Sequence, residues 1–245
     1  MPKKKPSEVD VWLGRETPRV RKALENASRH LDPQSGLTVH TLEAMYARES
    51  SFGVLVGERG STRPAGHFQL KANVAKHYGL SVSKKNDQRF NIDFASSAAA
   101  QYLRDQYSKF STRTVLSKDR ITIPIKDASE RKKFAFGAYN AGEGRIAEAQ
   151  RLTREAGKDP QSWDQVQKFL ELAGSSKTEA AQARQYVEEV PTYQIEFMQK
   201  SLAGKNSKGK TAKKGEYRCI DGHWVTIDDR HVLICDSKDS DSKSG

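Results

Sequence analysis

Three short segments of the chain combine small residues with a few polar ones in the middle of otherwise regular sequence pattern. They are residues 47–53 (ARESSFG), 65–70 (AGHFQL) and 135–142 (AFGAYNAG). The first contains Glu49, which closes a predicted helix. A carboxylate in the last turn of a helix faces the negative end of the helix dipole, which disfavours its ionised form. This favours a raised pKa, the property that a general acid needs.

The elements that must position these segments are predominantly helices. Apolar residues recur at helical spacing up to about residue 203, which predicts a mainly α-helical fold. Asn91 is a predicted helix cap, Ser162 and Ser176 each open a capping box, and Pro191 is expected to kink or split the last helix. The predicted helices cover residues 17–31, 38–49, 69–78, 92–109, 128–139, 143–156 and 177–203.

Residues 111–126 interrupt the helical pattern. Ile121, Ile123 and Ile125 alternate there with polar residues or proline, as in an exposed strand. We therefore expect a small β-hairpin inserted between two helices.

The composition is that of a basic globular protein. The 245 residues include 42 Lys and Arg against 31 Asp and Glu, a net charge of +11. Such an excess favours polyanionic partners, among them nucleic acid, anionic lipid, teichoic acid and the acidic stem peptides of bacterial cell wall, without choosing between them. No window approaches the ~18–20 apolar residues of a membrane-spanning helix. Residues 1–15 are expected to be a flexible basic N-terminus without an ordinary secretion signal.

The C-terminal part has a different composition. Residues 204–215 are rich in Lys, Gly and Ser and predict a linker, residues 216–236 predict a small β module, and residues 237–245 predict a disordered tail. The β module is expected to contain three strands, at about 217–220, 223–227 and 231–235.

Both cysteines of the chain, Cys219 and Cys235, fall in this module. A disulfide between them would stabilise so small a sheet and would indicate an oxidising compartment. The alternative is two free thiols packed as small hydrophobic residues. No His or further Cys stands at ligand spacing around them, so we expect no metal.

Taken together and in this order, the polar segments resemble the catalytic domain of the SLT-type lytic transglycosylases, lysozyme-like enzymes that cleave peptidoglycan. The family pattern is a helix-terminal Glu-Ser, a Gly-x-x-Gln segment, Ala-Tyr-Asn-Ala-Gly and a late Tyr-Val on a helix. The pattern appears here as Glu49-Ser50, residues 66–69, residues 138–142 and Tyr186-Val187. The resemblance predicts a lysozyme-like α+β domain over residues 16–203. Residues 141–163 look most like the branch of the membrane-bound F-type enzymes.

The resemblance implies a mechanism with one carboxylate. Glu49 would act first as acid and then as base on the β-1,4 bond between N-acetylmuramic acid and N-acetylglucosamine, leaving a 1,6-anhydromuramic end without consuming water. Tyr186 would hydrogen-bond and orient Glu49. The residues expected to line the groove and bind the sugars are Ser50, Gln69, Tyr139 and Asn140. From the residues alone, Ser50 could instead satisfy a helix end, and Tyr139 could instead be a core aromatic.

Other charged residues near the motifs are weaker candidates for a functional role. We expect four acids to be solvated surface residues or helix-end charges, namely Glu58, Asp87, Asp93 and Glu143. Arg63 and Lys71 are candidates to contact the acidic stem peptide or the muramic lactyl group. No cofactor is expected.

Two alternative functions are open at this level. One is a goose-type lysozyme that activates a water, and the other is a non-catalytic cell-wall-binding protein of the same fold. The expected partner is the peptidoglycan glycan strand and not nucleic acid, with the C-terminal module as a candidate anchor to wall or protein. Action would then take place in the periplasm or cell wall, reached by a signal since removed, by phage delivery or through a secretion system.

Overall fold

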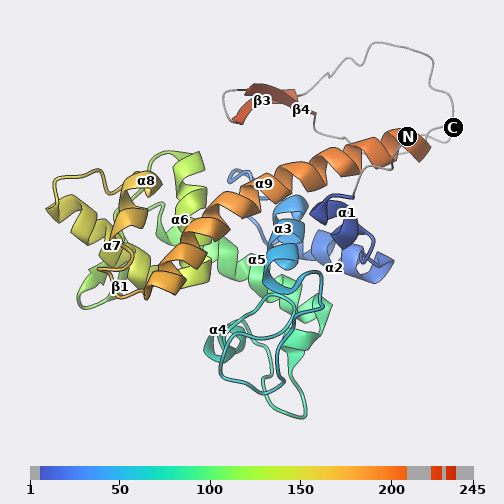
Figure 1. Ribbon diagram of the computed structural model, residues 1–245, viewed down its shortest axis with the longest axis horizontal. Coiled ribbons are helices and arrows are strands. Elements are labelled where there is room, and N and C mark those ends of the chain that lie inside the picture. The colour runs from blue at the N-terminus through green and yellow to red at the C-terminus, as the bar shows by residue number, and fades with distance from the viewer. Residues whose placement is uncertain (1–5, 209–221, 228–229, 236–245) are drawn as a thin grey trace, which may run out of the picture. The chain divides into compact units, whose positions relative to one another are not determined.

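The computed structural model describes residues 6–208, 222–227 and 230–235. The chain divides into two compact units, Met1–Leu202 and Ala203–Gly245. The first unit is mainly α-helical, as the sequence predicts (Figure 1). The elements of residues 6–208 in chain order are α1 (Glu8–Leu13), α2 (Pro18–Ser28), α3 (Val39–Ser50), α4 (Ala72–His77), a 3-10 turn (Gln88–Phe90), α5 (Ile92–Lys109), β1 (Val115–Ser117), β2 (Arg120–Ile121), α6 (Ala128–Ala141), α7 (Glu143–Glu155), α8 (Trp163–Val166), a second 3-10 turn (Gln167–Phe169) and α9 (Lys177–Lys208).

Helix α1 lies where a flexible N-terminus was predicted, so that prediction is wrong for these residues. The Ser7 hydroxyl accepts a hydrogen bond from the Asp10 N–H, and the Asp10 carboxylate accepts one from the Ser7 N–H, which completes a capping box. Val9 and Trp12 are buried, and the Trp12 ring packs edge-on against Tyr193 with centroids 4.9 Å apart. These contacts, together with the Asp10–Lys200 ion pair, dock the short helix on α9.

Helix ends follow the predicted caps with three exceptions. Helix α5 begins after Asn91 as predicted, and Ser176 forms its capping box with Glu179. Helix α6 continues through Asn140 to Ala141 and ends at Gly142, whose φ of 92° only glycine adopts easily. Ser162 makes no side-chain cap, and α8 lasts a single turn. Helix α4 begins at Ala72, three residues later than predicted.

Helix α9 is one continuous helix through Pro191, so the predicted split does not occur. It crosses the larger unit (Figure 1) and is held along its length by ion pairs from α7, α3 and α1. These pairs are Arg145–Glu179, Arg48–Glu189 and Asp10–Lys200. Packing over this length outweighs the one hydrogen bond that a proline removes. The helix also runs to Lys208, into the predicted linker.

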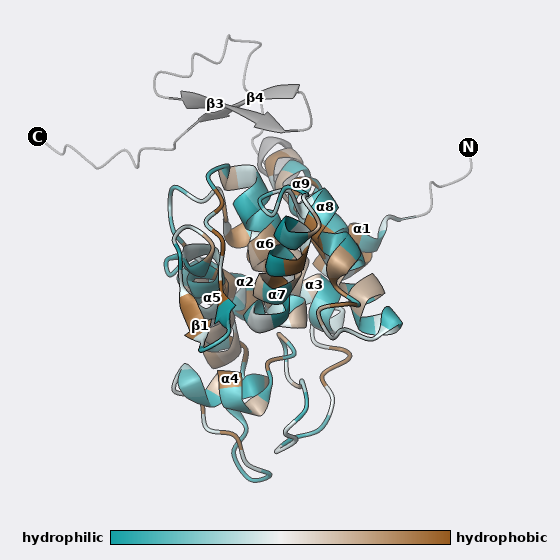
Figure 2. Cartoon of the chain, turned by 90° about the vertical axis from the view of Figure 1, so that its left-hand side faces the viewer, coloured by the Kyte–Doolittle hydropathy of each residue, from teal (hydrophilic) through white to brown (hydrophobic). Residues whose placement is uncertain are grey.

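Residues 51–91 form a lobe of loops that contains α4, here called the loop lobe. It lies on one side of the helices in both views (Figures 1 and 2). The apolar core lies between the packed helices, where α5 contacts α2 and α6, and α6 contacts α7. The predicted hairpin insertion is present as β1 and β2, which pair antiparallel, but of the three alternating isoleucines only Ile121 lies in a strand, and Ile125 is buried in the core. In the described part of the chain, no helix has the length and apolarity needed to cross a membrane.

The second unit contains β3 (Gly222–Ile227) and β4 (Arg230–Cys235), an antiparallel pair in which Trp224 is opposite Leu233. These strands correspond to two of the three predicted ones. The strand predicted at 217–220, the Cys219–Cys235 bond and the tail at 237–245 lie outside the described residues or side chains.

Candidate active site

Glu49 stands one residue before the end of α3, at a turn with an uncommon backbone. Ser51, Phe52 and Gly53 all adopt left-handed conformations, with φ of 49°, 58° and 84°. Two consecutive non-glycine residues at positive φ are strained and persist only where their surroundings hold them. Gly53 leaves no room for a side chain, because a Cβ there would lie 2.5 Å from the Tyr46 hydroxyl.

Ser50 holds this turn and is not among the residues that line the groove, contrary to its predicted place there. Its side chain is fully buried. The hydroxyl donates to the His67 carbonyl oxygen over 2.7 Å and accepts from the Gly53 N–H over 3.0 Å. Ser50 is the last residue of α3, and its hydrogen bonds are those of a residue that satisfies a helix end.

The Gly-x-x-Gln segment requires its glycine for steric reasons. Gly66 has a φ of 81°, and a Cβ there would lie 2.1 Å from the Arg89 carbonyl oxygen. This close approach allows the His67 N–H to donate to the same carbonyl over 2.9 Å. The Gln69 amide donates to the carbonyls of Gly66 (2.8 Å) and Leu55 (3.2 Å) and so fixes the lip of the loop lobe.

A buried ion pair that the sequence analysis missed supports the whole segment. Arg89 and Asp87 are joined at 2.7 Å with side chains inaccessible to solvent. The Arg89 guanidinium also donates to the carbonyls of Ser61, Arg63 and Leu70. Burial opposes ionisation of Asp87, but hydrogen bonds from Arg89 and Gly60 outweigh it and lower its pKa. Asp87 is therefore not the solvated residue that we expected, although it does cap the 3-10 turn.

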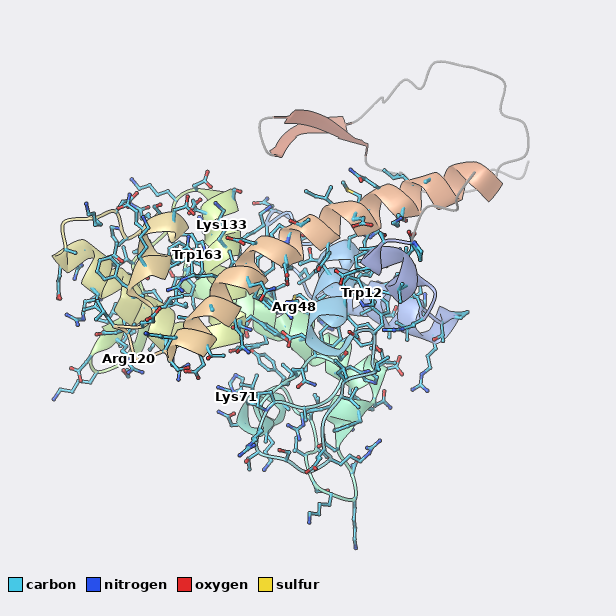
Figure 3. The ribbon with its side chains drawn as sticks, viewed as in Figure 1. Trp12, Arg48, Lys71, Arg120, Lys133 and Trp163 are labelled. Carbon is cyan, nitrogen blue, oxygen red and sulfur yellow. The ribbon has the colours of Figure 1, made fainter. Side chains whose placement is uncertain are left out.

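Close helix packing positions the third motif. A Cβ on Gly137 would lie 2.4 Å from the Trp163 ring, so the glycine lets α6 approach α8 closely. Figure 3 shows Trp163 beside α6. Tyr139 and Asn140 follow near the end of α6, and the Tyr139 hydroxyl donates to the Phe68 carbonyl over 3.0 Å. The Phe-Gly-Ala-Tyr-Asn sequence thus joins α6 to the loop lobe.

These elements enclose a groove of about 240 Å³ between the loop lobe and the helices. Four of the six predicted site residues line it, namely Glu49, Gln69, Tyr139 and Asn140. The other lining residues are Pro64, Leu70, Lys71, Val74, Tyr102, Ala141, Gly142, Arg145, Glu179 and Gln182. Tyr186 is buried behind the groove, and its ring stacks on that of Tyr139 with centroids 6.2 Å apart and an interplanar angle of 7°.

Burial sets the protonation of Glu49. It raises the pKa of the carboxyl to about 7, while the Tyr186 hydroxyl and the Arg48 guanidinium act in the opposite direction. Burial and the neighbouring Glu49 charge raise the pKa of Tyr186. The Tyr186 hydroxyl is buried without a hydrogen-bond partner within the usual distance, although it lies close enough to Glu49 to lower the pKa of that carboxyl. Glu49 therefore titrates near neutral pH beside a buried donor.

A second carboxylate in the groove, Glu179, was missed by the sequence analysis except as a capping residue. Its carboxylate pairs with Arg145 at 2.9 Å. Hydrogen bonds from the Ser176 backbone, then from Arg145 and the Ser176 hydroxyl, lower its pKa to about 2. The tertiary fold, which pairs Glu179 of α9 with Arg145 of α7, brings it to the groove wall, so no local sequence signal could have placed it there.

The remaining charged candidates lie as follows. Glu58 is exposed, while Asp93 and Glu143 lie in the first turns of α5 and α7, consistent with surface or helix-end charges. Lys71 lines the groove and Arg63 does not. Among the residues that the structure describes, no group of three or more His, Cys, Asp and Glu could hold a metal ion.

Comparison with known proteins identifies the family. The model of the Transglycosylase SLT domain matches residues 28–162, more than half of the chain. The chain belongs to the SLT transglycosylase family. The matched region contains Glu49, Gln69, Tyr139 and Asn140, whereas Tyr186 lies beyond it.

Curated relatives of this SLT chain carry the name membrane-bound lytic murein transglycosylase F, as the resemblance to the F-type branch predicts. The protein from Aeromonas hydrophila is 37% identical over 55% of this chain and 25% of its own length. That from Shewanella frigidimarina is 30% identical over 49% of this chain and 21% of its own length. The protein from Desulfosudis oleivorans is 25% identical over 72% of this chain and 36% of its own length. The chain thus spans between about a fifth and a third of the length of these relatives.

Proposed function

We propose that this chain is a peptidoglycan lytic transglycosylase with Glu49 as its single acid and base. It would cleave the β-1,4 bond between N-acetylmuramic acid and N-acetylglucosamine. The observation that carries this proposal is a carboxyl with a pKa of about 7 that lines a groove together with the amides of Gln69 and Asn140. Near neutral pH such a carboxyl is populated in both forms, so it can give a proton in one step and take one in the next.

In the first step, Glu49 gives its proton to the glycosidic oxygen as the bond from that oxygen to the anomeric carbon of N-acetylmuramic acid breaks. N-acetylglucosamine leaves with a free 4-hydroxyl. The acetamido group of the muramic residue stabilises the positive charge at the anomeric carbon, a substrate-assisted route.

In the second step, the Glu49 carboxylate takes the proton from the 6-hydroxyl of the same muramic residue. The 6-oxygen then bonds to the anomeric carbon and closes the 1,6-anhydro ring. Glu49 returns to its protonated form and no water is consumed.

The neighbours of Glu49 have separate roles in this scheme. The Tyr186 hydroxyl, which lacks another partner, orients the carboxyl and stabilises its ionised form. Asn140 is exposed on the groove wall, and its amide can both donate to and accept from sugar hydroxyl and acetamido groups. The Tyr139 hydroxyl already donates to the Phe68 carbonyl oxygen, so Tyr139 contributes mainly the face and edge of its ring to the groove.

The ion pair of Glu179 favours a transglycosylase over a goose-type hydrolase. Hydrolysis with inversion needs a second carboxylate that takes a proton from water. Glu179 is the other carboxylate among the described groove residues, and its pairing with Arg145 and its pKa of about 2 make it a weak base. Glu49 is thus left to carry both proton transfers.

Release of dye from labelled peptidoglycan tests this assignment. We expect wild type and Glu179→Gln to release dye, and Glu49→Gln to co-sediment with the wall without releasing it. Loss of release in Glu179→Gln with a folded protein would support the hydrolase. Co-sedimentation without release by the wild type would support the non-catalytic wall-binding protein.

We also propose that the chain acts outside the cytoplasmic membrane, because its proposed substrate lies there. The unit that contains β3 and β4 is a candidate anchor to wall or to a protein partner. A chain that ends after Lys208 should retain dye release and bind intact wall less well. Unchanged wall binding by this shortened chain would contradict the anchoring role.

A further inference from the structure

The two cations that line the groove differ in their partners. Arg145, on the helical wall, is neutralised by Glu179 at 2.9 Å. Lys71, on the wall formed by the loop lobe, makes no salt bridge with any residue that the structure describes. Its side chain is exposed, and Figure 3 shows it at the edge of the loop lobe that faces the first turns of α9. Of the two groove cations, Lys71 is therefore the one that no ion pair among the described residues neutralises.

The backbone of Lys71 is firmly held. The carbonyl of the preceding Leu70 accepts a hydrogen bond of 2.9 Å from the buried Arg89 guanidinium. Lys71 is itself the cap residue of α4, whose Ala72 and Ala75 are buried. A fixed backbone with a flexible ammonium-bearing stem suits recognition of an anion whose position varies, because a lysine binds as a point charge.

Lys71 also lies apart from the proton chemistry. The pKa of Glu49 is set by burial, Tyr186 and Arg48, and Lys71 does not contribute to it.

We propose that Lys71 binds a carboxylate of the glycan and makes the groove prefer strands that contain muramic acid over uncharged N-acetylglucosamine polymers. This inference rests on the proposed function. The carboxylate has two possible sources with the same chemistry. One is the lactyl group of a muramic residue that has lost its peptide, and the other is the stem peptide, whose attachment converts the lactyl carboxyl to an amide.

Equilibrium binding to catalytically inactive protein tests the proposal. Glu49→Gln, Glu49→Gln/Lys71→Met, Glu49→Gln/Lys71→Arg and Glu49→Gln/Lys76→Met would each be titrated calorimetrically. The ligands are N-acetylchitohexaose, a peptide-free muramyl oligosaccharide and a peptide-bearing one. Lys76 is an exposed lysine of α4 outside the groove, so Lys76→Met is a control that removes the same charge as Lys71→Met at a different site.

We expect Lys71→Met to weaken binding of a carboxylate-bearing ligand about 3- to 10-fold and to leave chitohexaose binding unchanged. Lys71→Arg should restore affinity, Lys76→Met should have no effect, and added salt should reduce the difference. Weaker binding of the peptide-free ligand would assign the lactyl group as the source of the carboxylate. Weaker binding of the peptide-bearing ligand would assign the stem peptide. If Lys71→Met weakened binding of all three ligands equally, or weakened binding of none of them, the proposed role of Lys71 would be overturned. Failure of every variant to bind any glycan would instead contradict the proposed function.

Discussion

The Ser50 hydroxyl donates a 2.7 Å hydrogen bond to the carbonyl oxygen of His67, which ties the end of the Glu49 helix to the middle of the Gly-x-x-Gln segment. Two motifs that are 17 positions apart in the sequence are therefore parts of one structural unit. Of these two neighbouring residues, Glu49 faces the groove, whereas Ser50 is buried and fixes the turn that follows the helix.

Ser50→Ala tests this structural role. The Gly53 N–H and the His67 carbonyl would each lose a buried partner, so we expect the free energy of unfolding to fall by about 1–3 kcal/mol. Urea unfolding measures the change. Ser108→Ala is the control, because Ser108 is exposed on α5 and should change stability by less than about 0.5 kcal/mol. Equal effects of the two substitutions would contradict the role of Ser50.

Glu49→Gln should stabilise the protein in a pH-dependent way. The pKa of Glu49 is raised from 4.5 to about 7, so between these values the unfolded state ionises while the folded state holds its proton. Wild type therefore loses stability as the pH rises through this window, and the variant does not. We expect no difference near pH 4 and an advantage of up to about 3 kcal/mol for the variant at pH 8.

Thermal or urea unfolding across pH 4–8 measures this difference. Burial and the neighbouring Glu43 also raise the pKa of Glu16 to about 7, but Glu16 is present in both proteins and cancels from the comparison. An advantage of Glu49→Gln that is the same at every pH would show that Glu49 does not titrate as described.

Tyr186→Phe should separate orientation of the acid from stability. The hydroxyl that it removes is buried and unpaired, so the free energy of unfolding should change by less than about 1 kcal/mol. The hydroxyl lowers the pKa of Glu49, so its removal should raise that pKa and move the alkaline fall of activity to higher pH. We expect about tenfold slower turnover from the less well oriented carboxyl.

Initial rates of wall digestion against pH measure both effects. Tyr193→Phe is the matched control, since Tyr193 lies on the same helix and bonds Glu8 far from the groove. A slower Tyr186→Phe enzyme with an unshifted pH profile would argue against a direct effect on Glu49.

Gly66→Ala and Gly79→Ala distinguish backbone strain from steric exclusion. Both glycines have a φ near 80°, but a Cβ at Gly79 meets nothing within 4 Å, whereas one at Gly66 would meet the Arg89 carbonyl at 2.1 Å. We expect Gly79→Ala to cost about 1 kcal/mol and Gly66→Ala about 3 kcal/mol or more, with loss of activity. Unfolding curves and dye release check this. Similar costs at both positions would show that the close approach at Gly66 is unimportant.

The sequence predicted those parts of the site that depend on short segments. The segments that contain Glu49, Gln69 and Asn140 stood out in the sequence because each combines small and polar residues, and the resemblance to the family supplied their expected roles. The helix periodicity likewise predicted most helices of the larger unit, because their apolar faces are regular.

The parts that could not be predicted depend on tertiary packing or on unusual backbone. Ser51 and Phe52 adopt left-handed conformations that neither residue type signals, and the Gly53 N–H of that turn donates to the buried Ser50 hydroxyl. An arginine is ordinarily found at the protein surface, but Arg89 is fully buried, because carbonyl groups from distant positions in the loop lobe accept its hydrogen bonds. Glu179 reaches the groove only through the packing of α9.

Mass spectrometry of the muropeptides released from purified peptidoglycan tests the central claim most directly. A single acid and base at Glu49 predicts 1,6-anhydromuramic ends from wild type and no released product from Glu49→Gln. Reducing muramic ends, each one water heavier, would show that a water is activated and that the mechanism is hydrolytic. Anhydro products from Glu49→Gln would contradict the assignment of Glu49 itself.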